Sequence, residues 1–306
     1  YELPTDAKAT DEYVVAIAFK LNADSDWAQA GYIIAWDHFV IKPGGATSLA
    51  EVQADLGLVE ARDVNDEFQI IGDGFTAVVS KTSGTLTSWT IDDQELLAGP
   101  LTPSFWKTPN DNQYRNNFSQ RLGAWKDAAA NAEITSITAE AGVSCIVITA
   151  ESKLPVGETT CTVVYTVYGT GEIEVTQTLT PQGNNLPLIP RIGMDVSIFD
   201  TMSSVQWYGL SGETYWDRKT GGFLGLHLGN ALTWNHAYAR TQDVGNHADT
   251  RWMSFTDELR GIGVKVTALG DPLNMSAWPF TPEDLEAANH PFDLPTRDTL
   301  HVRIDH

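Results

Sequence analysis

Short segments of alternating or β-branched apolar residues recur along the chain and are its dominant pattern. The clearest of them span residues 14–19, 68–71, 75–79, 172–179 and 263–266. Gly, Asn, Asp and Pro separate such segments at intervals of roughly ten residues, a spacing typical of a sandwich or barrel. The pattern therefore predicts an all-β protein.

Only two segments are expected to be helical. Residues 119–130 can form one or two turns. Residues 281–288 form a better helix, because Thr281 can cap the first turn and Pro282 suits the first helical position. Glu283 and Asp284 complement the positive end of the helix dipole.

A linker is predicted at residues 43–66. It opens with Pro-Gly-Gly-Ala-Thr-Ser, which is loop chemistry, and the next strand–turn–strand rhythm begins at Glu67. Residues 1–42 hold only about three strand-like segments, and a sheet of that size is marginally stable alone in water. We therefore expect residues 1–42 to end another domain and to pack on the larger domain, a partner chain or preceding residues. The start at Tyr1, without a Met or an apolar leader, predicts processing or a longer parent chain.

Composition excludes several classes of protein. Of the 306 residues 42% are hydrophobic and 19% are charged, which excludes wholesale disorder. The chain has 19 basic and 40 acidic side chains, hence a net charge of −21. That excess repels phosphate backbones and anionic lipids, so neither nucleic acid nor a membrane surface is expected as a partner. No segment approaches the roughly 20 apolar residues that a membrane-spanning helix needs.

The two cysteines permit two interpretations. Cys145 and Cys161 fall in neighbouring strand-like segments joined by a turn at residues 154–157. They can form a disulfide if their Cα atoms lie within about 7 Å, and the alternative is two small buried thiols. Glycosylation triplets begin at Asn117 and Asn274, which leaves secretion open.

No sequence motif for a metal, a catalytic serine or a phosphate loop is present. The seven histidines are scattered without ligand spacing, so no metal ligand is assigned. The chemistry is instead concentrated in three segments that are dense in polar and aromatic residues, at 105–114, 207–218 and 238–252.

The first of these segments has the composition of a sugar site. Asn110, Asp111 and Asn112 offer polar groups for hydroxyls, and Tyr114 offers a flat ring for the C–H face of a sugar. The alternative is a self-satisfied structural loop.

The other two segments offer sugar contacts or a framework. If the second segment is extended, Glu213, Tyr215 and Asp217 share one face, with carboxylates about 13 Å apart. Glycosidase acid pairs lie about 5–9.5 Å apart, so a binding role for Glu213 and Tyr215 is favoured over catalysis. A buried Arg218–carboxylate pair is the alternative. Other residues are expected to support the site without contacting a sugar. They are Asn246 in a tight turn, Trp252 at the end of the same segment, and a buried ionic network of Asp217, Arg218, Asp249 and Arg251.

These segments resemble glycoside hydrolase family 2 β-galactosidases of the bacterial type. Residues 105–112 (FWKTPNDN) resemble the FWRAPTDND loop of that family's C-terminal domain. Residues 209–218 are similar to its GxGPxExYxDR motif, and residues 238–252 to YxxPQExGNRxDVRW. Further matches in the same order are residues 190–194 (PRIGM), residues 285–290 (LEAANH) and, upstream, residues 27–36 (WAQAGYIIAW), which resemble WxEAGHxVAW.

The resemblance implies a galactose-mutarotase-like β-supersandwich over residues 67–306, preceded by the last strands of an immunoglobulin-like β-sandwich in residues 1–42. In that family the catalytic glutamates and the active-site metal ligands lie in a (β/α)₈ barrel. This chain has no such barrel, so no catalytic residue, cofactor or metal ligand is assigned to it, and any divalent metal belongs to the barrel. In that family the C-terminal part, which is a separate small subunit in some members, forms a wall of the galactose pocket. The expected partners are the barrel portion or a large subunit, galactosides and, as an alternative, a second copy of the chain.

Some positions depart from the family pattern. Gln113 replaces the second Asp of the loop motif, Arg115 replaces a Gly, and Thr241 and His247 replace a Pro and an Arg. Residues 302–306 resemble the start of the segment that carries the family's pocket tryptophan, so the final strands are expected to be lacking. The leading hypothesis is a C-terminal part or small subunit of a β-galactosidase, inactive alone. The alternative is a stand-alone lectin-like protein on the same fold. The family slightly favours the cytoplasm.

Overall fold

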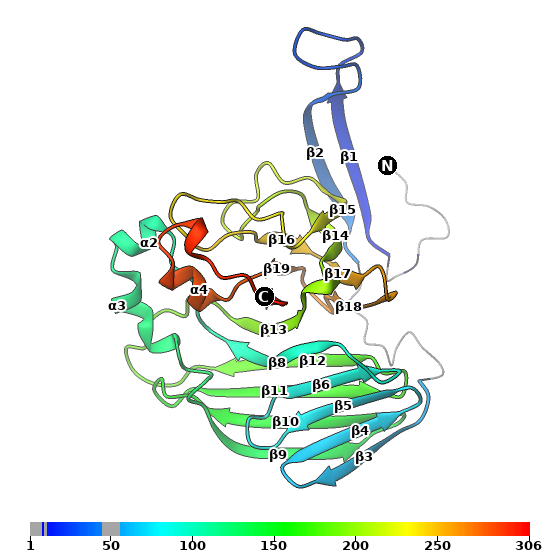
Figure 1. Ribbon diagram of the computed structural model, residues 1–306, viewed down its shortest axis with the longest axis vertical. Helices are drawn as coiled ribbons and strands as arrows, with labels where there is room; N and C mark the ends of the chain where they lie inside the picture. Colours follow the sequence, from blue (N-terminus) through cyan, green and yellow to red (C-terminus); the bar gives the residue numbers. More distant parts are fainter. Residues whose placement is uncertain (1–7, 9–10, 45–55) are drawn as a thin grey trace.

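The computed structural model describes residue 8 and residues 11–44 and 56–306. Antiparallel strands dominate it, so the predicted all-β class is confirmed (Figure 1). Two sheets pack face to face in the lower part of the view, a third sheet lies above them, and a two-stranded hairpin stands out from the body. No helix in the described part of the chain is long and apolar enough to cross a membrane.

The largest sheet has ten strands and runs the length of the body. Its order is β16-β19-β20-β13-β8-β6-β5-β4-β3, with β7 paired to β6. Alternation explains its buried face: in β5 the side chains of Phe75, Ala77 and Val79 are buried while those between them are not. Its strands are β3 (Val59–Val64), β4 (Glu67–Gly72), β5 (Phe75–Ser80), β6 (Leu86–Ile91), β7 (Gln94–Glu95), β8 (Leu97–Ser104), β13 (Gly193–Phe199), β16 (His247–Thr250), β19 (Leu273–Trp278) and β20 (Thr299–Asp305).

Two four-stranded sheets complete the body. The first packs on the β3–β8 part of the large sheet and shares its core, to which β11 contributes Val163, Tyr165 and Val167. Its order is β12-β11-β10-β9, formed by β9 (Glu133–Ala141), β10 (Cys145–Lys153), β11 (Thr160–Tyr168) and β12 (Ile173–Thr180). The second has the order β15-β14-β17-β18, formed by β14 (Ser204–Leu210), β15 (Leu224–Asn230), β17 (Trp252–Asp257) and β18 (Ile262–Thr267).

Strand β3 begins at Val59, before the predicted start of the larger domain at Glu67. It pairs with β4 at the edge of the large sheet, where polar residues such as Glu60 and Arg62 are tolerated and weaken the apolar pattern. The predicted linker at 43–66 is therefore too long at its C-terminal end, and residues 45–55 lie outside the described residues.

Strands β1 (Tyr13–Lys20) and β2 (Ile33–Lys42) form the projecting hairpin. Arg251 of the body binds Glu12 at the base of the hairpin, and further along β2 Trp36 packs edge-on against Phe223 at 5.3 Å. Elsewhere large apolar side chains are exposed on both faces, namely Ile17, Phe19, Trp27, Tyr32, Ile33, Ile34, Phe39, Val40 and Ile41. Two described strands form where about three were predicted, and they bury little apolar surface of their own.

The helices are short. The predicted helix at 281–288 is α4 (Pro282–Ala287), and Thr281 forms a capping box with Asp284 through N–H···O contacts of 2.8 and 3.3 Å. The segment at 119–130 forms α3 (Phe118–Leu122) and the 3₁₀ turn η1 (Gly123–Trp125). The remaining short elements are α2 (Asp111–Arg115), η2 (Asp200–Met202) and η3 (Pro291–Asp293).

The two cysteines are free thiols, so the disulfide interpretation is wrong. They do lie on adjacent strands, but Cys145 pairs with Tyr168 and Cys161 pairs with Ser152. The two positions are therefore seven residues apart along β10, about 24 Å at the rise of a strand. Cys161 is buried and Cys145 is half-buried.

His247 is buried in β16 against both Trp207 and Trp234, and its ring centroid lies 4.6 Å from the ring centroid of each. Burial lowers its pKa to about 4, whereas an unfolded histidine titrates near 6.5. Between those values the unfolded chain binds a proton and the folded chain does not, so stability falls as the pH falls. We expect this histidine to remove about 3 kcal/mol of stability between pH 7.5 and pH 4.

Urea unfolding across that pH range tests this expectation against a His247→Phe variant. The variant should show a shallower loss of stability toward acid, with the two curves diverging below about pH 6.5. Parallel curves would show that this histidine does not contribute to the acid sensitivity.

Candidate functional site

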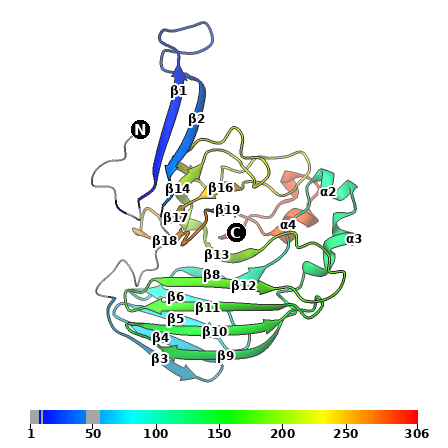
Figure 2. The same ribbon diagram turned by 180° about the vertical axis from the view of Figure 1, so that it is seen from behind.

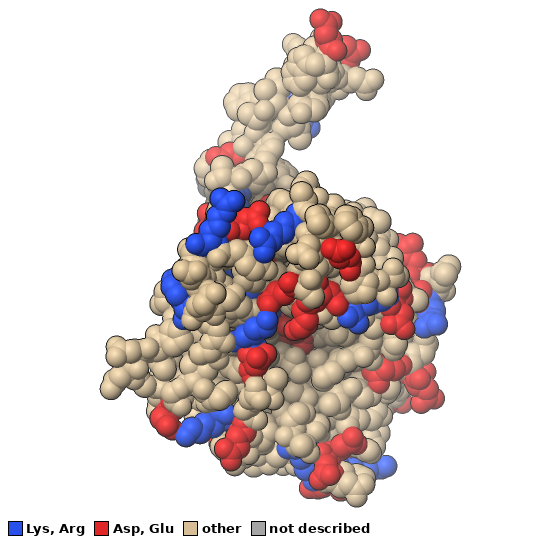
Figure 3. All heavy atoms as spheres, turned by 60° about the vertical axis from the view of Figure 1, so that its left-hand side comes forward, with Lys and Arg blue, Asp and Glu red and all other residues tan. Residues whose placement is uncertain are grey.

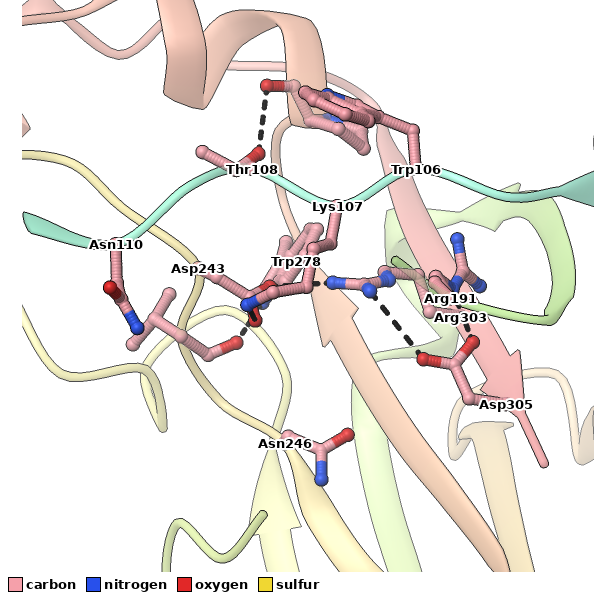
Figure 4. Close-up of polar contacts among 12 residues, drawn as sticks. Trp106, Lys107, Thr108, Asn110, Arg191, Asp243, Asn246, Trp278, Arg303 and Asp305 are labelled. Atoms are coloured by element: carbon pink, nitrogen blue, oxygen red, sulfur yellow. Dashed lines mark hydrogen bonds and ion pairs between the residues drawn. The ribbon is translucent and has the colours of Figure 1, made fainter. Parts of the chain in front are cut away.

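A buried ionic network underlies the site, and Figure 4 shows it. Asp243 lies at its centre, accepting from Lys107 Nζ at 3.1 Å and from Arg303 Nη1 at 2.6 Å. Asp305 bridges Arg303 and Arg191. The side chains of Asp243 and Arg303 are 8% and 4% exposed, so these charges depend on one another rather than on water.

The network is reinforced from two directions. Arg303 lies over the ring of Trp278 at 5.1 Å, and Trp278 donates from its indole N–H to the carbonyl of Val244 at 2.8 Å. On the other side Arg191 binds Asp195 at 2.7 Å. Burial opposes ionisation of Asp243, but Arg303 and Lys107 outweigh it and hold the pKa of that carboxyl below its usual value.

An open cleft of about 480 Å³ lies against this network, and Lys107 and Asp243 form part of its lining. Figure 3 brings forward the side of the molecule that carries α2 and α3, where acidic and basic side chains gather. The other lining residues are Asn110, Asp111, Asn112, Glu213, Tyr215, Arg218, Thr220, Tyr238 and Gln242.

The first wall is the turn that leads into α2. Asn110 caps the helix, accepting from the N–H of Gln113 at 3.0 Å, and Gln113 accepts from the N–H of Asn110 at 3.0 Å. Gln113 is thus the reciprocal partner of a capping box at the position where the family pattern has an Asp. Gln242 accepts from the N–H of Asp111 at 3.1 Å and ties this turn to the opposite loop.

The second wall carries Glu213 and Tyr215. Glu213 accepts from the backbone N–H of His236 at 3.0 Å. Tyr215 faces the network, with its hydroxyl 3.5 Å from the carbonyl oxygen of Asp243, and burial followed by the Asp243 charge raises its pKa above the usual value. A phenol with a raised pKa stays protonated and can donate a hydrogen bond.

Five of the six candidate sugar contacts meet in this cleft: Asn110, Asp111, Asn112, Glu213 and Tyr215. Tyr114 does not line it, and instead carries Arg240 over its ring at 4.1 Å. The condition of an extended segment from 213 to 217 is not met, because Tyr215 and Arg218 close a tight turn with backbone hydrogen bonds of 2.9 and 3.3 Å. That turn directs Asp217 away from the cleft.

The expected buried network of Asp217, Arg218, Asp249 and Arg251 does not form. Asp217 and Arg218 are a surface pair at 3.5 Å, with side chains 76% and 62% exposed. Asp249 binds Lys219 at 2.6 Å, and Arg251 binds Glu12 at the hairpin base. The tight turn explains the difference, because it leaves Asp217 and Arg218 at the surface, with Arg218 in the lining of the open cleft.

The other two framework candidates have separate roles. Asn246 is buried and donates to the carbonyl of Thr214 at 2.7 Å, which supports the second wall of the cleft. Trp252 packs under Lys265 at 4.6 Å on the third sheet.

The charges that do form the buried network were missed by the sequence analysis. One pattern in the sequence does indicate a charged cluster. In β20 the residues His301, Arg303 and Asp305 occupy alternate positions and so share one face of the strand. Lys107, Arg191 and Asp243 come from separate segments, and only the strand order brings them to that face.

The cleft has the chemistry of a polyhydroxy ligand site. It offers donors on Lys107 and Arg218, carboxylate acceptors on Asp111 and Glu213, and a ring on Tyr215. No group of three or more His, Cys, Asp or Glu side chains in the described ranges is arranged to hold a metal ion.

Several known proteins are similar to this chain. Residues 71–306 match the family model described as the β-galactosidase small chain. A β-galactosidase from Priestia megaterium is 33% identical over the whole of this chain, which covers 29% of that protein. One from Lactobacillus delbrueckii subsp. bulgaricus is 29% identical over 95% of this chain and 28% of its own length. A β-galactosidase small subunit from Latilactobacillus sakei is 28% identical, with 73% of this chain and 79% of that subunit covered.

Proposed function

Because the chain belongs to the β-galactosidase small-chain family, we propose that its cleft forms one wall of a galactoside pocket in a β-galactosidase. The observation that supports this proposal most directly is that Asn110–Asn112, Glu213 and Tyr215 line one cleft, which lies against the buried ionic network. In this proposal the chain binds and orients the sugar, and the catalytic carboxylates come from a larger portion of the enzyme.

The family relationship supports a larger catalytic partner. The chain spans under a third of the length of the first two relatives described above, and a third relative is a small subunit by name. The projecting hairpin supports the same view, because its exposed apolar faces need a covering surface. We infer that the larger portion packs on β1 and β2 while its catalytic groups face the cleft.

A chimera tests the proposed function. This chain replaces the matching segment of the Priestia megaterium β-galactosidase, and hydrolysis of 4-nitrophenyl β-galactoside is measured. We expect hydrolysis by the chimera and none by this chain alone, because the catalytic groups are supplied by the rest of that enzyme. A folded chimera that hydrolyses no β-galactoside would contradict the proposal.

A further inference from the structure

Strand β15 is the outermost strand of its four-stranded sheet, and in the described part of the chain it pairs only with β14. The hairpin covers the beginning of β15, because Val14 packs against the cluster that contains the buried Leu224. Beyond that point the side chains of Leu226 and Leu228 are 60% and 76% exposed. The edge that these two leucines occupy is therefore open to another strand.

The backbone groups that face this open edge belong to the same two leucines. Just before β15, the backbone N–H of Ser211 donates to the carbonyl of Phe223 at 3.0 Å, and just after it Ala231 donates to the carbonyl of the residue opposite. Hydrogen-bonded positions alternate along an antiparallel pair, so the odd-numbered residues of β15 bond to β14. The N–H and C=O groups of Leu226 and Leu228 therefore point away from β14, toward the open edge.

Charge distinguishes β15 from the other edges. Among the strands that the structure describes at the edges of sheets, only β15 has no charged side chain; Glu60 in β3, Glu140 in β9 and Lys265 in β18 are examples on the others. Charged residues on an edge strand oppose pairing with another strand. Because the chain has a net charge of −21, an uncharged strand is the edge through which two copies can approach with least repulsion.

The sequence of β15 is symmetric about its centre. Residues 225–229 read Gly-Leu-His-Leu-Gly in both directions from His227. If two copies pair antiparallel about a twofold axis at His227, Leu226 lies opposite Leu228 of the partner subunit, and glycine lies opposite glycine. Each leucine pair then exchanges two backbone hydrogen bonds, since these residues have the groups that face the edge. The leucines of both strands share one face and shield one another from water.

We propose that β15 pairs antiparallel with β15 of a second copy of this chain, about a twofold axis at His227. The pairing joins the β15-β14-β17-β18 sheets of the two copies into one continuous sheet. The connection between β14 and β15 carries Glu213 and Tyr215, so the contact also supports the strand pair that holds the second wall of the cleft. The inference does not depend on the proposed function, because it needs neither a sugar nor a catalytic portion.

Sedimentation velocity over about a hundredfold range of protein concentration tests the proposal. The wild-type chain should reach twice its mass of 33.5 kDa as the concentration rises. Leu228→Glu should remain a monomer, because pairing would set a carboxylate against the apolar Leu226 of the partner subunit and add like charge to the contact. Leu259→Glu is the control, since Leu259 is fully exposed outside β15 and this variant should dimerise as the wild type does. A monomeric wild-type chain, or a dimer that persists in Leu228→Glu, would overturn the proposal.

Cysteine cross-linking tests the register. Leu226→Cys and Leu228→Cys are made in a chain that also has Cys145→Ser, which removes the half-buried native thiol. Opposite residues of an antiparallel pair have Cα atoms about 5.5 Å apart, within reach of a disulfide. On oxidation, a mixture of the two variants should give a covalent dimer with one copy of each, identified by mass spectrometry, and either variant alone should give much less. Equal cross-linking by each variant alone would contradict pairing about His227.

Discussion

Replacement of Asp243 by Ala is expected to lower the free energy of unfolding by about 3–5 kcal/mol. The change removes the carboxylate that binds both Lys107 and Arg303. Arg303 is 4% exposed and cannot recover its hydration, so a buried charge is left short of a partner. Because Asp243 also lines the cleft, the same variant should weaken any ligand held there.

Urea unfolding at neutral pH measures this effect, with Asp217→Ala as the control. Asp217 also pairs with an arginine, but both side chains are largely exposed, so the control should lose no more than about 1 kcal/mol. A loss below about 1 kcal/mol for Asp243→Ala would show that the buried network does not stabilise the fold.

Replacement of Trp125 by Ala is also expected to lower the free energy of unfolding by about 3–5 kcal/mol. In this variant the cause is a cavity in the core and not an unpaired charge. Trp125 is fully buried in η1, packs edge-on against Phe105 at 6.0 Å and donates to the carbonyl of Pro187 at 3.0 Å. Phe105 opens the segment that continues to Asn110, so the cavity should also loosen the first wall of the cleft.

Circular dichroism is the suitable probe for this experiment, because the change removes a fluorescent side chain. Trp216→Ala is the matched control, because it removes the same residue type from a position that is 76% exposed. Its free energy of unfolding should change by no more than about 0.5 kcal/mol. Similar losses for the two variants would contradict the packing role of Trp125.

Local patterns were enough to predict the class, the most clearly alternating strands and one helix. Alternation in β5 and the capping residues of α4 act through neighbouring residues, so they can be recognised in the sequence alone. The register of a hairpin is also local. The turn at 154–157 sets Cys161 opposite Ser152, and this register keeps the two cysteines apart.

The candidate site was only half predictable. The motif residues of the two walls, such as Asp111 and Glu213, were found because composition and resemblance mark them. The ionic floor was missed, because Lys107, Asp243 and Arg303 meet only through the order of strands in the large sheet. The turn between Tyr215 and Arg218 could not be predicted, since composition does not distinguish a tight turn from an extended segment there.

The most direct test of whether the cleft binds galactoside compares two variants of the chimera, Asp111→Ala and Asp217→Ala. The quantity measured for each is kcat/KM. Both carboxylates are exposed and close to the same loops, but only Asp111 lines the cleft. Loss of a hydrogen bond that the carboxylate accepts from a substrate hydroxyl should lower kcat/KM for 4-nitrophenyl β-galactoside about 10- to 100-fold in Asp111→Ala. The Asp217→Ala value should be unchanged. Equal kcat/KM values for the two variants would contradict the assignment of this cleft to the sugar.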